Sequence, residues 1–321
     1  MQIRYISYGT SKTGGYRHEK CLFESCLRFL AINHKIEAKL IRKSQLFESP
    51  AAHIYLMLWA FFQSAGDINI VTARTGVSAI LRNLFNKKQV WIVLHNYDSN
   101  DNKSLSLNWY YHFLFYLLRK QKNERIKVVV VANYWKRFFE KEIELPKVHV
   151  FPNLFDTLAY EKHRSKHKDN WVHLGQFSSK NDDGIFPLAE KLSAEGYYCY
   201  FSTLNPNEAN ENKNFDVLYF PHFNEYLEHI SRSICTLALS RIKEGWNRVA
   251  HESMLLGTPV IGYDAGGLGD LLKESKSMVV NSVDEVYECI TQNLFVLPDS
   301  SFTEKYDLNN FAKYTIQICP N

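Results

Sequence analysis

The clearest evidence of the architecture lies in residues 239–272, which read LSRIKEGWNRVAHESMLLGTPVIGYDAGGLGDLL. An apolar strand, a loop, a helical stretch, a tight turn, a second strand, a glycine turn and a second helix follow one another there. Gly257 falls just after the first helical stretch, where a left-handed backbone costs a glycine least, and Pro259 comes two residues later. Strands that alternate with helices in this way predict a parallel sheet covered by helices.

The same alternation continues on both sides of this stretch. Strands are expected at residues 3–7, 68–71, 90–94, 128–132 and 148–151, and again at 171–175, 198–201, 217–220, 235–239, 259–263 and 278–280. Helices are expected between the first-half strands, at residues 19–31, 51–62, 77–85, 107–119 and 134–142. The polar residues 152–170 have no helical or strand period, so they predict a linker.

These elements predict an α/β chain with two Rossmann-like, doubly wound domains that face each other across a cleft. In such sheets, ligands bind outside the carboxyl ends of the strands. The expected domains are residues 1–155 and 156–300, and residues 301–321 are expected to supply a helix, at 302–318, that crosses back to the first domain. A length of 321 residues also favours two domains, because one core rarely grows beyond about 250–300 residues.

The composition narrows the class of protein. Hydrophobic residues make up 45% and charged residues 22%, which excludes a disordered or low-complexity chain. Six scattered cysteines without a Cys-x-x-Cys pair predict reduced thiols rather than a zinc site or a disulfide framework. No apolar stretch reaches the ~20 residues of a membrane span, and MQIRYISYG is typical of a strand rather than a secretory signal. A cytoplasmic location is therefore expected, including the inner face of the membrane.

Charge is distributed unevenly along the chain. Residues 1–155 carry 23 Lys and Arg against 11 Asp and Glu, a net charge of +12, whereas the remainder carries 15 against 23, a net charge of −8. This asymmetry predicts that the first half faces an anionic partner or surface. The aromatic stretch WYYHFLFYLLRKQK at residues 109–122 is consistent with a peripheral membrane contact or with an ordinary core helix. Nucleic acid is not expected as a partner, because no recognised binding module occurs.

Two carboxylates flank the start of the first helix in the opening stretch. Glu244 precedes that helix and Glu252 lies inside it, while Gly245, Trp246 and Asn247 supply backbone N–H groups that suit a diphosphate. Carboxylates accept hydrogen bonds from vicinal hydroxyls, so this order of groups fits a sugar, a diphosphate, a ribose and a base. The alternative is that Glu244 caps the helix and Glu252 is a surface residue.

The block EGWNRVAHE at residues 244–252, with SMLLGTPVIGYDAGG after it, resembles the E-x7-E region of the retaining family-four glycosyltransferases, which have the two-Rossmann GT-B fold. The family pattern is close to E-G-F-G-L-V-x-x-E-A-M-A-x-G-x-P-V-I and ends in a glycine pair. Here Trp246 stands for the aromatic residue, Asn247 for the second glycine and Arg248 for the aliphatic residue. The two acids, the Gly-Thr-Pro-Val turn and the glycine pair keep the family's spacing.

Weaker similarities lie in the first half. Gly14 and Gly15 in TSKTGGYRHEK, with Arg17 beyond them, are similar to the family's first glycine-rich loop, which approaches the donor phosphates and the acceptor. Read alone, the two glycines predict only a turn. His95, at the end of the strand WIVLH, resembles the family's histidine on the amino-terminal side of the cleft. Read alone, a single histidine at a strand end is more often structural, whereas its position at the carboxyl end of the strand favours a functional role.

One cation of the family pattern is missing. The segment HLGQFSSKNDDG resembles the family's G-R-x-x-x-x-K-G loop, whose two cations meet the diphosphate. Gln176 occupies the arginine position, and Lys180 lies one residue early. A positive charge is therefore lacking unless it is supplied by Arg248, Lys243, Arg241 or Arg17.

The resemblance implies a retaining hexosyltransferase in polysaccharide or glycoconjugate biosynthesis. The donor is a nucleotide diphosphate sugar, taken as a UDP-sugar on family frequency, and the acceptor is a saccharide or a lipid-linked saccharide. The implied catalytic residues are Glu244, His95 and Lys180. The implied donor-binding residues are Gly14, Gly15, Arg17, Gln176, Lys180, Trp246, Asn247, Arg248 and Glu252. No cofactor or metal is expected, and no D-x-D pair occurs in the sequence.

Two other functions stay open. A nucleotide-sugar epimerase would need acid/base carboxylates in the first half, where only Asp67 and Asp98 fall near strand ends. A nucleotide-sugar-binding module without catalysis is suggested by Gln176 at the arginine position. A NAD-dependent dehydrogenase is set aside, since no G-x-G-x-x-G follows any strand.

Overall fold

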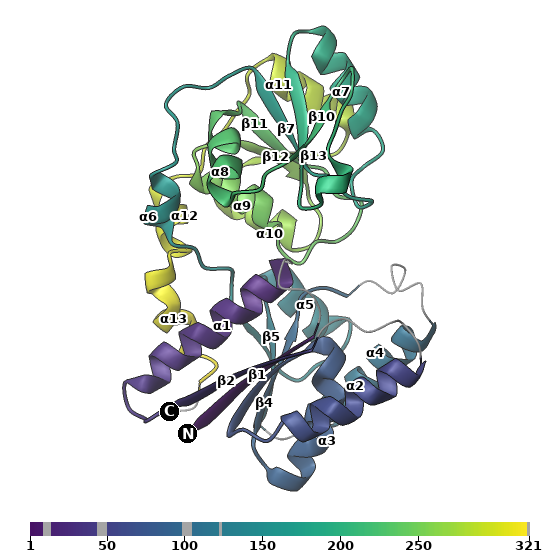
Figure 1. Ribbon diagram of the computed structural model, residues 1–321, viewed down its shortest axis with the longest axis vertical. Helices are drawn as coiled ribbons and strands as arrows, with labels where there is room; N and C mark the ends of the chain where they lie inside the picture. The colour runs from purple at the N-terminus through teal and green to yellow at the C-terminus, as the bar shows by residue number, and fades with distance from the viewer. Residues whose placement is uncertain (9–13, 44–49, 98–104, 122–123, 320–321) are drawn as a thin grey trace. The chain divides into compact units, whose positions relative to one another are not determined.

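The computed structural model describes residues 1–8, 14–43, 50–97, 105–121 and 124–319, and the chain forms two compact units (Figure 1). Unit 1 comprises Met1–Leu154 together with Asn310–Asn321, and unit 2 comprises Phe155–Asn309. The division falls one residue before the boundary expected from the sequence. The segment that returns to unit 1 begins at residue 310, nine residues after the expected position.

Unit 1 is built on a six-stranded parallel sheet in the order β2-β1-β3-β4-β5-β6. Its strands are β1 (Gln2–Tyr8), β2 (Glu37–Lys43), β3 (Ile68–Thr72), β4 (Gln89–Leu94), β5 (Ile126–Val130) and β6 (Val148–Val150). The chain leaves β1 toward β2 and then returns past β1 to β3. The carboxyl ends of β1 and β3 therefore flank the point where the strand order reverses, which is the usual ligand position in such sheets.

Five helices connect these strands: α1 (Gly14–Ala31), α2 (Pro50–Gln63), α3 (Ala73–Asn86), α4 (Leu105–Lys120) and α5 (Asn133–Lys141). Helix α3 packs against both α2 and α4, whereas α1 packs against α13 (Phe311–Thr315) (Figure 1). The rings of Phe151 and Tyr314 meet at 6.4 Å, so the last segment of the chain closes onto unit 1.

The single helix expected at residues 302–318 is wrong. The segment instead forms α12 (Ser300–Lys305), a 3₁₀ turn (Leu308–Asn310) and α13. Phe155 explains the interruption, because its N–H donates to Tyr306 O at 3.0 Å and its carbonyl accepts from Leu308 N at 2.7 Å. These bonds hold the intervening chain in a bridge with Phe155 rather than in a helical turn.

Strand β2 was not expected from the sequence. Its residues, EAKLIRK, carry four charges and lie at the edge of the sheet, where most of them are exposed. An edge strand that is hydrogen-bonded on one side needs no continuous apolar run, and charges there discourage pairing with other chains. The hydrophobic pattern consequently gives no signal for it.

Unit 2 contains a seven-stranded sheet in the order β13-β12-β11-β7-β8-β10-β9. Its strands are β7 (Trp171–Gln176), β8 (Tyr198–Thr203), β9 (Asn210–Glu211), β10 (Asp216–Tyr219), β11 (Cys235–Ala238), β12 (Val260–Tyr263) and β13 (Met278–Val280). All pairs are parallel except β9 with β10. The strand order reverses between β7 and β11, so a ligand is expected outside the carboxyl ends of these two strands.

The helices of unit 2 cover a core of apolar side chains from β7, β8, β11 and their neighbours. They are α6 (Thr157–Glu161), α7 (Ile185–Ala194), α8 (Phe223–Arg232), α9 (Arg248–Leu255), α10 (Gly267–Ser275), α11 (Val283–Thr291) and α12. A 3₁₀ turn, Pro206–Glu208, follows β8.

Part of the expected linker is ordered structure. Asp156 caps α6 by accepting from Ala159 N at 3.2 Å, and Phe155 and Tyr160 are buried in a cluster with Leu227, Ile230, Leu255 and Leu256. The interpretation of residues 152–170 as a plain linker is therefore wrong for this part. A five-residue helix that is held by one cap and two buried rings leaves no period in the sequence.

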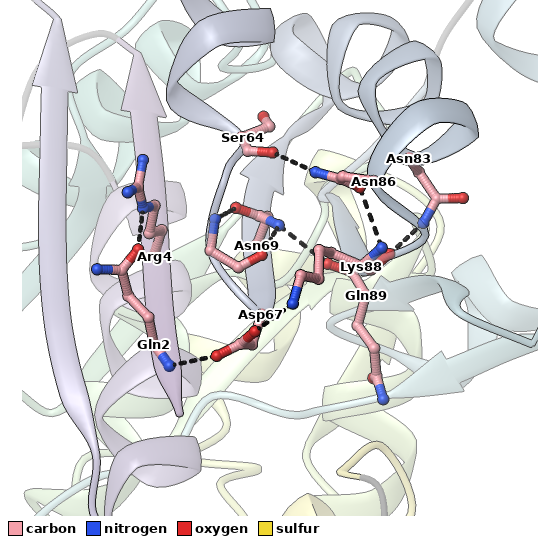
Figure 2. Close-up of polar contacts among 10 residues, drawn as sticks. Gln2, Arg4, Ser64, Asp67, Asn69, Asn83, Asn86, Lys88 and Gln89 are labelled. Carbon is pink, nitrogen blue, oxygen red and sulfur yellow. Dashed lines mark hydrogen bonds and ion pairs between the residues drawn. The ribbon is translucent and has the colours of Figure 1, made fainter.

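A polar network closes the amino-terminal edge of the first sheet (Figure 2). Gln2 N and Lys88 Nζ donate to the two oxygens of Asp67 at 2.7 and 2.6 Å. The buried Asn69 side chain accepts from Gly66 N, and its Nδ2 donates to Gly66 O and, at 3.2 Å, to Gln89 O. The hydrogen bond from Lys88, followed by that from Gln2, lowers the pKa of Asp67. Asp67 thus stabilises the edge opposite the one where ligands usually bind in such sheets.

Candidate functional site

The loops after β7 and β11 are joined at the carboxyl edge of the second sheet. Arg241 N donates to Lys180 O at 2.8 Å, Asp182 N donates to Leu239 O at 2.9 Å, and Asn181 forms a β-bridge with Ser240. These contacts hold the loop that contains Lys180 beside the loop that leads to Glu244. Both loops lie where the strand order reverses, so the structure brings these two predicted residues to one edge.

The glycine turn after β12 packs directly against Glu244. Glu244 and Gly266 form a parallel bridge, and Gly267 N donates to Glu244 O at 2.8 Å. Gly266 has φ +63°, and a Cβ placed there would lie 2.6 Å from Glu244 O. The first glycine of the pair, Gly266, is therefore required by backbone contact with the acid, 22 residues earlier in the chain. The Glu244 side chain accepts from Ser240 Oγ at 3.2 Å.

Asn247, not Glu244, caps helix α9. Its Oδ1 accepts from Ala250 N at 2.9 Å, and the helix begins at Arg248. The alternative in which Glu244 serves as the cap is therefore wrong, and its carboxylate lies in the loop before the helix. A helix N-terminus at Arg248 carries the positive end of the helix dipole to the same edge as Glu244.

A buried polar chain fixes α9 to the sheet. Ser253 Oγ donates to Thr236 Oγ1 at 2.9 Å, and the ring nitrogens of His173 lie 3.2 Å from Thr236 Oγ1 and 3.1 Å from Ser202 Oγ. Burial lowers the pKa of His173 to about 3, so the imidazole is neutral at physiological pH. Neutral hydrogen bonds join α9, β11, β7 and β8 without a buried charge.

Glu252 is buried, so the alternative that makes it a surface residue is wrong. The residue is 3% exposed. Oε1 accepts from Tyr160 OH at 3.3 Å and from Arg248 Nη2 at 3.2 Å, and Oε2 accepts from Tyr226 OH at 3.3 Å. Burial, followed by the charge of Glu252, raises the pKa of Tyr226, which keeps the phenol protonated as a donor.

Four cations were considered as replacements for the missing arginine, and the structure separates the three that lie in unit 2. The Arg248 guanidinium pairs with Glu252 and lies 4.5 Å from the centre of the Phe155 ring. Arg241 pairs with Asp183 and donates to Ser179 O. Lys243 is exposed in the loop before Glu244, as Lys180 is in the loop after β7, and neither forms an ion pair within the described part of the chain.

Two predicted donor-binding residues differ in exposure. Trp246 is 8% exposed, and its indole N–H donates to His251 Nδ1 at 3.1 Å while its ring packs against Tyr306. The Trp246 side chain is therefore part of the core, and only its backbone lies in the loop before α9. The Gln176 side chain is exposed at the end of β7, and the backbone carbonyl of Gln176 accepts from Asn181 Nδ2 at 3.0 Å.

In unit 1, His95 directly follows β4 and bonds to a carboxylate that the sequence did not single out. His95 Nε2 lies 2.8 Å from Glu19 Oε1, and Tyr5 OH donates to Glu19 Oε2 at 2.6 Å. The Glu19 side chain is 6% exposed, whereas that of His95 is 27% exposed. Glu19 therefore stands behind His95 as a buried acceptor. His18 Nε2 lies 2.6 Å from Phe151 O, and its ring meets that of His95 edge-on at 5.3 Å.

The first glycine-rich segment is described in part. Gly14 and Gly15 are the first residues of α1, and Arg17 is exposed in its first turn. Residues 9–13, which include most of the predicted loop, lie outside the described residues. Glu19 lies on the same helix, so α1 carries the predicted glycines and the partner of His95 together.

Two features are absent from residues 1–8, 14–43, 50–97, 105–121 and 124–319. Within those ranges, none of the helices combines the length and apolarity that crossing a bilayer requires. In the same part of the chain, no three His, Cys, Asp or Glu side chains gather as a set that could hold a metal ion.

No protein-family model matches the chain, and no curated protein matches it in sequence. Solved structures do match it over nearly its full length. A glycosyltransferase from Rickettsia africae ESF-5 is 15% identical with a TM-score of 0.67, covering 99% of this chain and 97% of that one. Alr3699/HepE from Anabaena in complex with UDP is 14% identical with a TM-score of 0.72, covering 99% of both chains. HepE is also solved with UDP-glucose.

A putative UDP-N-acetylglucosamine 2-epimerase from Listeria monocytogenes is 11% identical with a TM-score of 0.59, covering 97% of this chain and 94% of that one. At these identities the likeness establishes the fold. The chain has the GT-B fold, with two Rossmann-like α/β domains, and the predicted fold class is confirmed.

Replacing Gly266 with alanine is expected to destabilise the protein by about 1–3 kcal/mol, since its backbone conformation is strained for other residues and a Cβ would meet Glu244 O. Urea denaturation measures the change. The matched control is Gly196→Ala, which has φ +88° but nothing within 4 Å of the added Cβ. Equal losses in the two variants would show that the contact with Glu244 is not the constraint.

Proposed function

We propose that the protein is a retaining glycosyltransferase that moves a hexose from a nucleotide diphosphate sugar, a UDP-sugar, to a saccharide or lipid-linked saccharide. The observation that carries this proposal is the convergence of Lys180, Glu244, the glycine turn and the start of α9 where the strand order of the second sheet reverses. The complexes of HepE with UDP and UDP-glucose support a nucleotide sugar as the ligand of such a fold.

In this proposal unit 2 binds the donor. The carboxylate of Glu244 accepts hydrogen bonds from sugar hydroxyls, because it is partly exposed beside the glycine turn. The diphosphate lies at the start of α9, where the helix dipole favours an anion. Lys180 and Lys243 supply the cations, since the guanidinium groups of Arg241 and Arg248 already pair with carboxylates. Glu252 holds the ribose through exchange of one of its tyrosine donors.

Transfer requires stabilisation of the leaving group. When the bond between the anomeric carbon and the diphosphate breaks, negative charge develops on the phosphate oxygen and positive charge on the sugar. Fixed donors that already point to the phosphate lower the barrier because they need no reorganisation during the reaction. The N–H groups of the first turn of α9 fill that role here, Lys180 adds positive charge from its loop, and the departing phosphate accepts the proton of the acceptor hydroxyl.

Glu244→Gln is expected to lower the release of UDP from UDP-glucose about 10- to 100-fold, because an amide replaces a charged acceptor of hydrogen bonds. Coupled measurement of UDP in the presence and absence of saccharide acceptors gives the rate. Glu225→Gln is the matched control, since Glu225 is exposed on α8. Interconversion of sugars without UDP release would establish the epimerase, and stabilisation by UDP-glucose without turnover would establish a binding module.

His95 is proposed to orient the donor sugar or the acceptor hydroxyl, with Glu19 as its positioning residue. The buried carboxylate accepts from Tyr5 at one oxygen and contacts His95 at the other, so it fixes which ring nitrogen of His95 faces it. The second ring nitrogen is left to face a ligand. This arrangement pairs a partly exposed ring with a buried acid.

Glu19→Gln is expected to lower kcat about tenfold with little change in KM for the donor, because one charge-assisted hydrogen bond is lost. Steady-state kinetics with UDP-glucose separate the two constants. Tyr5→Phe is the control, since it removes the other hydrogen bond of the same carboxylate and leaves the contact with His95. If both variants lose activity equally and melt early, Glu19 serves the fold alone.

The acceptor is proposed to lie at an anionic membrane surface that unit 1 contacts through α4. One face of α4 is buried through Leu114, Phe115 and Leu118. Its other face exposes Trp109, Phe113 and Tyr116, at helical spacing, and the helix ends in exposed Arg119 and Lys120. Aromatic rings followed by basic residues are the composition that interfacial helices use.

Trp109→Ser combined with Phe113→Ser is expected to weaken cosedimentation with phosphatidylglycerol vesicles about tenfold, because two interfacial rings are removed. Leu158→Ser combined with Tyr219→Ser, at exposed positions of unit 2, is the control. Unchanged partition of the α4 variant would exclude this face as the contact.

The epimerase alternative loses one of its two acids. Asp67 lies at the amino edge of the first sheet, where Gln2 and Lys88 occupy both carboxylate oxygens (Figure 2). Asp98 lies outside the described residues. The Listeria epimerase supports only that this fold hosts such chemistry, so the assay above decides between the two reactions.

A further inference from the structure

Unit 1 contains a pocket that none of the predicted functions uses. Its volume is about 350 Å³, which is within the range of small-molecule sites. The polar lining comes from the start of α5, from β6 with the residue before it, and from the segment after α13. It comprises Asn133, Lys136, Lys147, His149 and Gln317.

Lysine side chains surround His149 on the face of the sheet where the pocket lies. Val129 and His149 are register partners on β5 and β6, so Lys127 and Lys147, two residues before each of them, lie on the face that carries His149. Lys136 reaches the same pocket from α5. Burial, and then the charges of Lys127, Lys147 and Lys136, lower the pKa of His149 to about 4. Three ammonium groups therefore act together on this neutral ring.

These lysines are only partly neutralised by their surroundings. Lys127 is half-buried and donates to Ile318 O. It does not line the pocket, but its positive charge acts on His149. Glu140 is the acid that acts on His149, and its Oε1 is engaged by Val148 N at 3.0 Å. Lys136 and Lys147 form no ion pair within the described ranges. The pocket thus has an excess of positive charge and of hydrogen-bond donors.

We infer that this pocket binds a phosphate ester of a small polyol, with the phosphate on Lys136 and Lys147 and the polyol hydroxyls on Asn133, His149 and Gln317. Ammonium groups donate and have no acceptor capacity, so they match an anion. The amides and the neutral imidazole both donate and accept, which matches hydroxyl groups. The volume of the pocket is larger than a lone phosphate ion would fill. The ester is either a soluble sugar phosphate or a phosphate-bearing lipid headgroup.

The test uses the full-length protein and glucose 1-phosphate, with glucose as the uncharged comparison. Calorimetry is expected to show binding of the phosphate ester, and NMR of the histidine side chains is expected to show a rise of the pKa of His149 from about 4. Lys136→Gln with Lys147→Gln is expected to weaken binding at least about tenfold, because two charged donors are lost. Lys39→Gln with Lys141→Gln is the control of equal charge, at exposed positions outside the pocket.

A second arm distinguishes the sources of the phosphate. Vesicles of phosphatidylinositol in phosphatidylcholine replace glucose 1-phosphate, with pure phosphatidylcholine as the comparison, and every protein in this arm carries Trp109→Ser and Phe113→Ser so that vesicle contact through α4 does not mask the pocket. Binding only to the anionic vesicles, lost in the Lys136/Lys147 variant and kept in the control, would assign a lipid headgroup. Equal losses in the two double variants, binding that leaves the His149 signals unmoved, or no binding of either probe would overturn the inference. None of these outcomes depends on transferase activity.

Discussion

Close backbone approaches at the carboxyl end of β11 determine the geometry of unit 2. Gly175, at φ +90°, would place a Cβ 2.8 Å from Leu237 O, and Gly266 would place one 2.6 Å from Glu244 O. The strand and the loop after it are therefore flanked by glycine on both sides, at the end of β7 and in the turn after β12. The contact between Gly266 and Glu244 O fixes the backbone at Glu244 and therefore the path of the chain into α9. The hydrogen bonds between the loops after β7 and β11 then hold the loop with Lys180 beside the same backbone.

Ion pairing distinguishes the charged residues that stabilise the start of α9 from the charged residues that are proposed to bind a ligand. A buried carboxylate without a cation would be costly, so the pairing with the partly buried Arg248 is a condition of burying Glu252. The motif position of Arg248 had suggested a phosphate ligand, but its partner and the Phe155 ring already occupy it. Lysines on exposed loops keep their hydration, so they need no carboxylate partner. With Gln176 at the position of the arginine, the proposed cationic role falls to the exposed side chains of Lys180 and Lys243.

The sequence predicted those parts of the fold that are set by local burial. Strands inside a parallel sheet are covered on both faces, and their apolar runs made nearly all of them visible. Strand β2 and helix α6 were missed because an edge position and a single Asp156 cap leave no such run. Glu19 was missed for another reason. Its partner His95 is 76 residues away, and only the packing of α1 beside the end of β4 shows that the two belong together.

The position of Glu252 decides how the second acid of the motif can act. Its contacts with Tyr160 and Tyr226 are both 3.3 Å, which is long for an O–H donor, whose usual distance to an oxygen is about 2.7–2.8 Å. A ribose hydroxyl that replaced one of these phenols would exchange one O–H donor for another, and the carboxylate would stay hydrogen-bonded throughout. A ligand group that displaced the Arg248 side chain would instead leave the buried charge of Glu252 unpaired. Exchange at a tyrosine is therefore the less costly route, and it leaves the ion pair that supports the start of α9 intact.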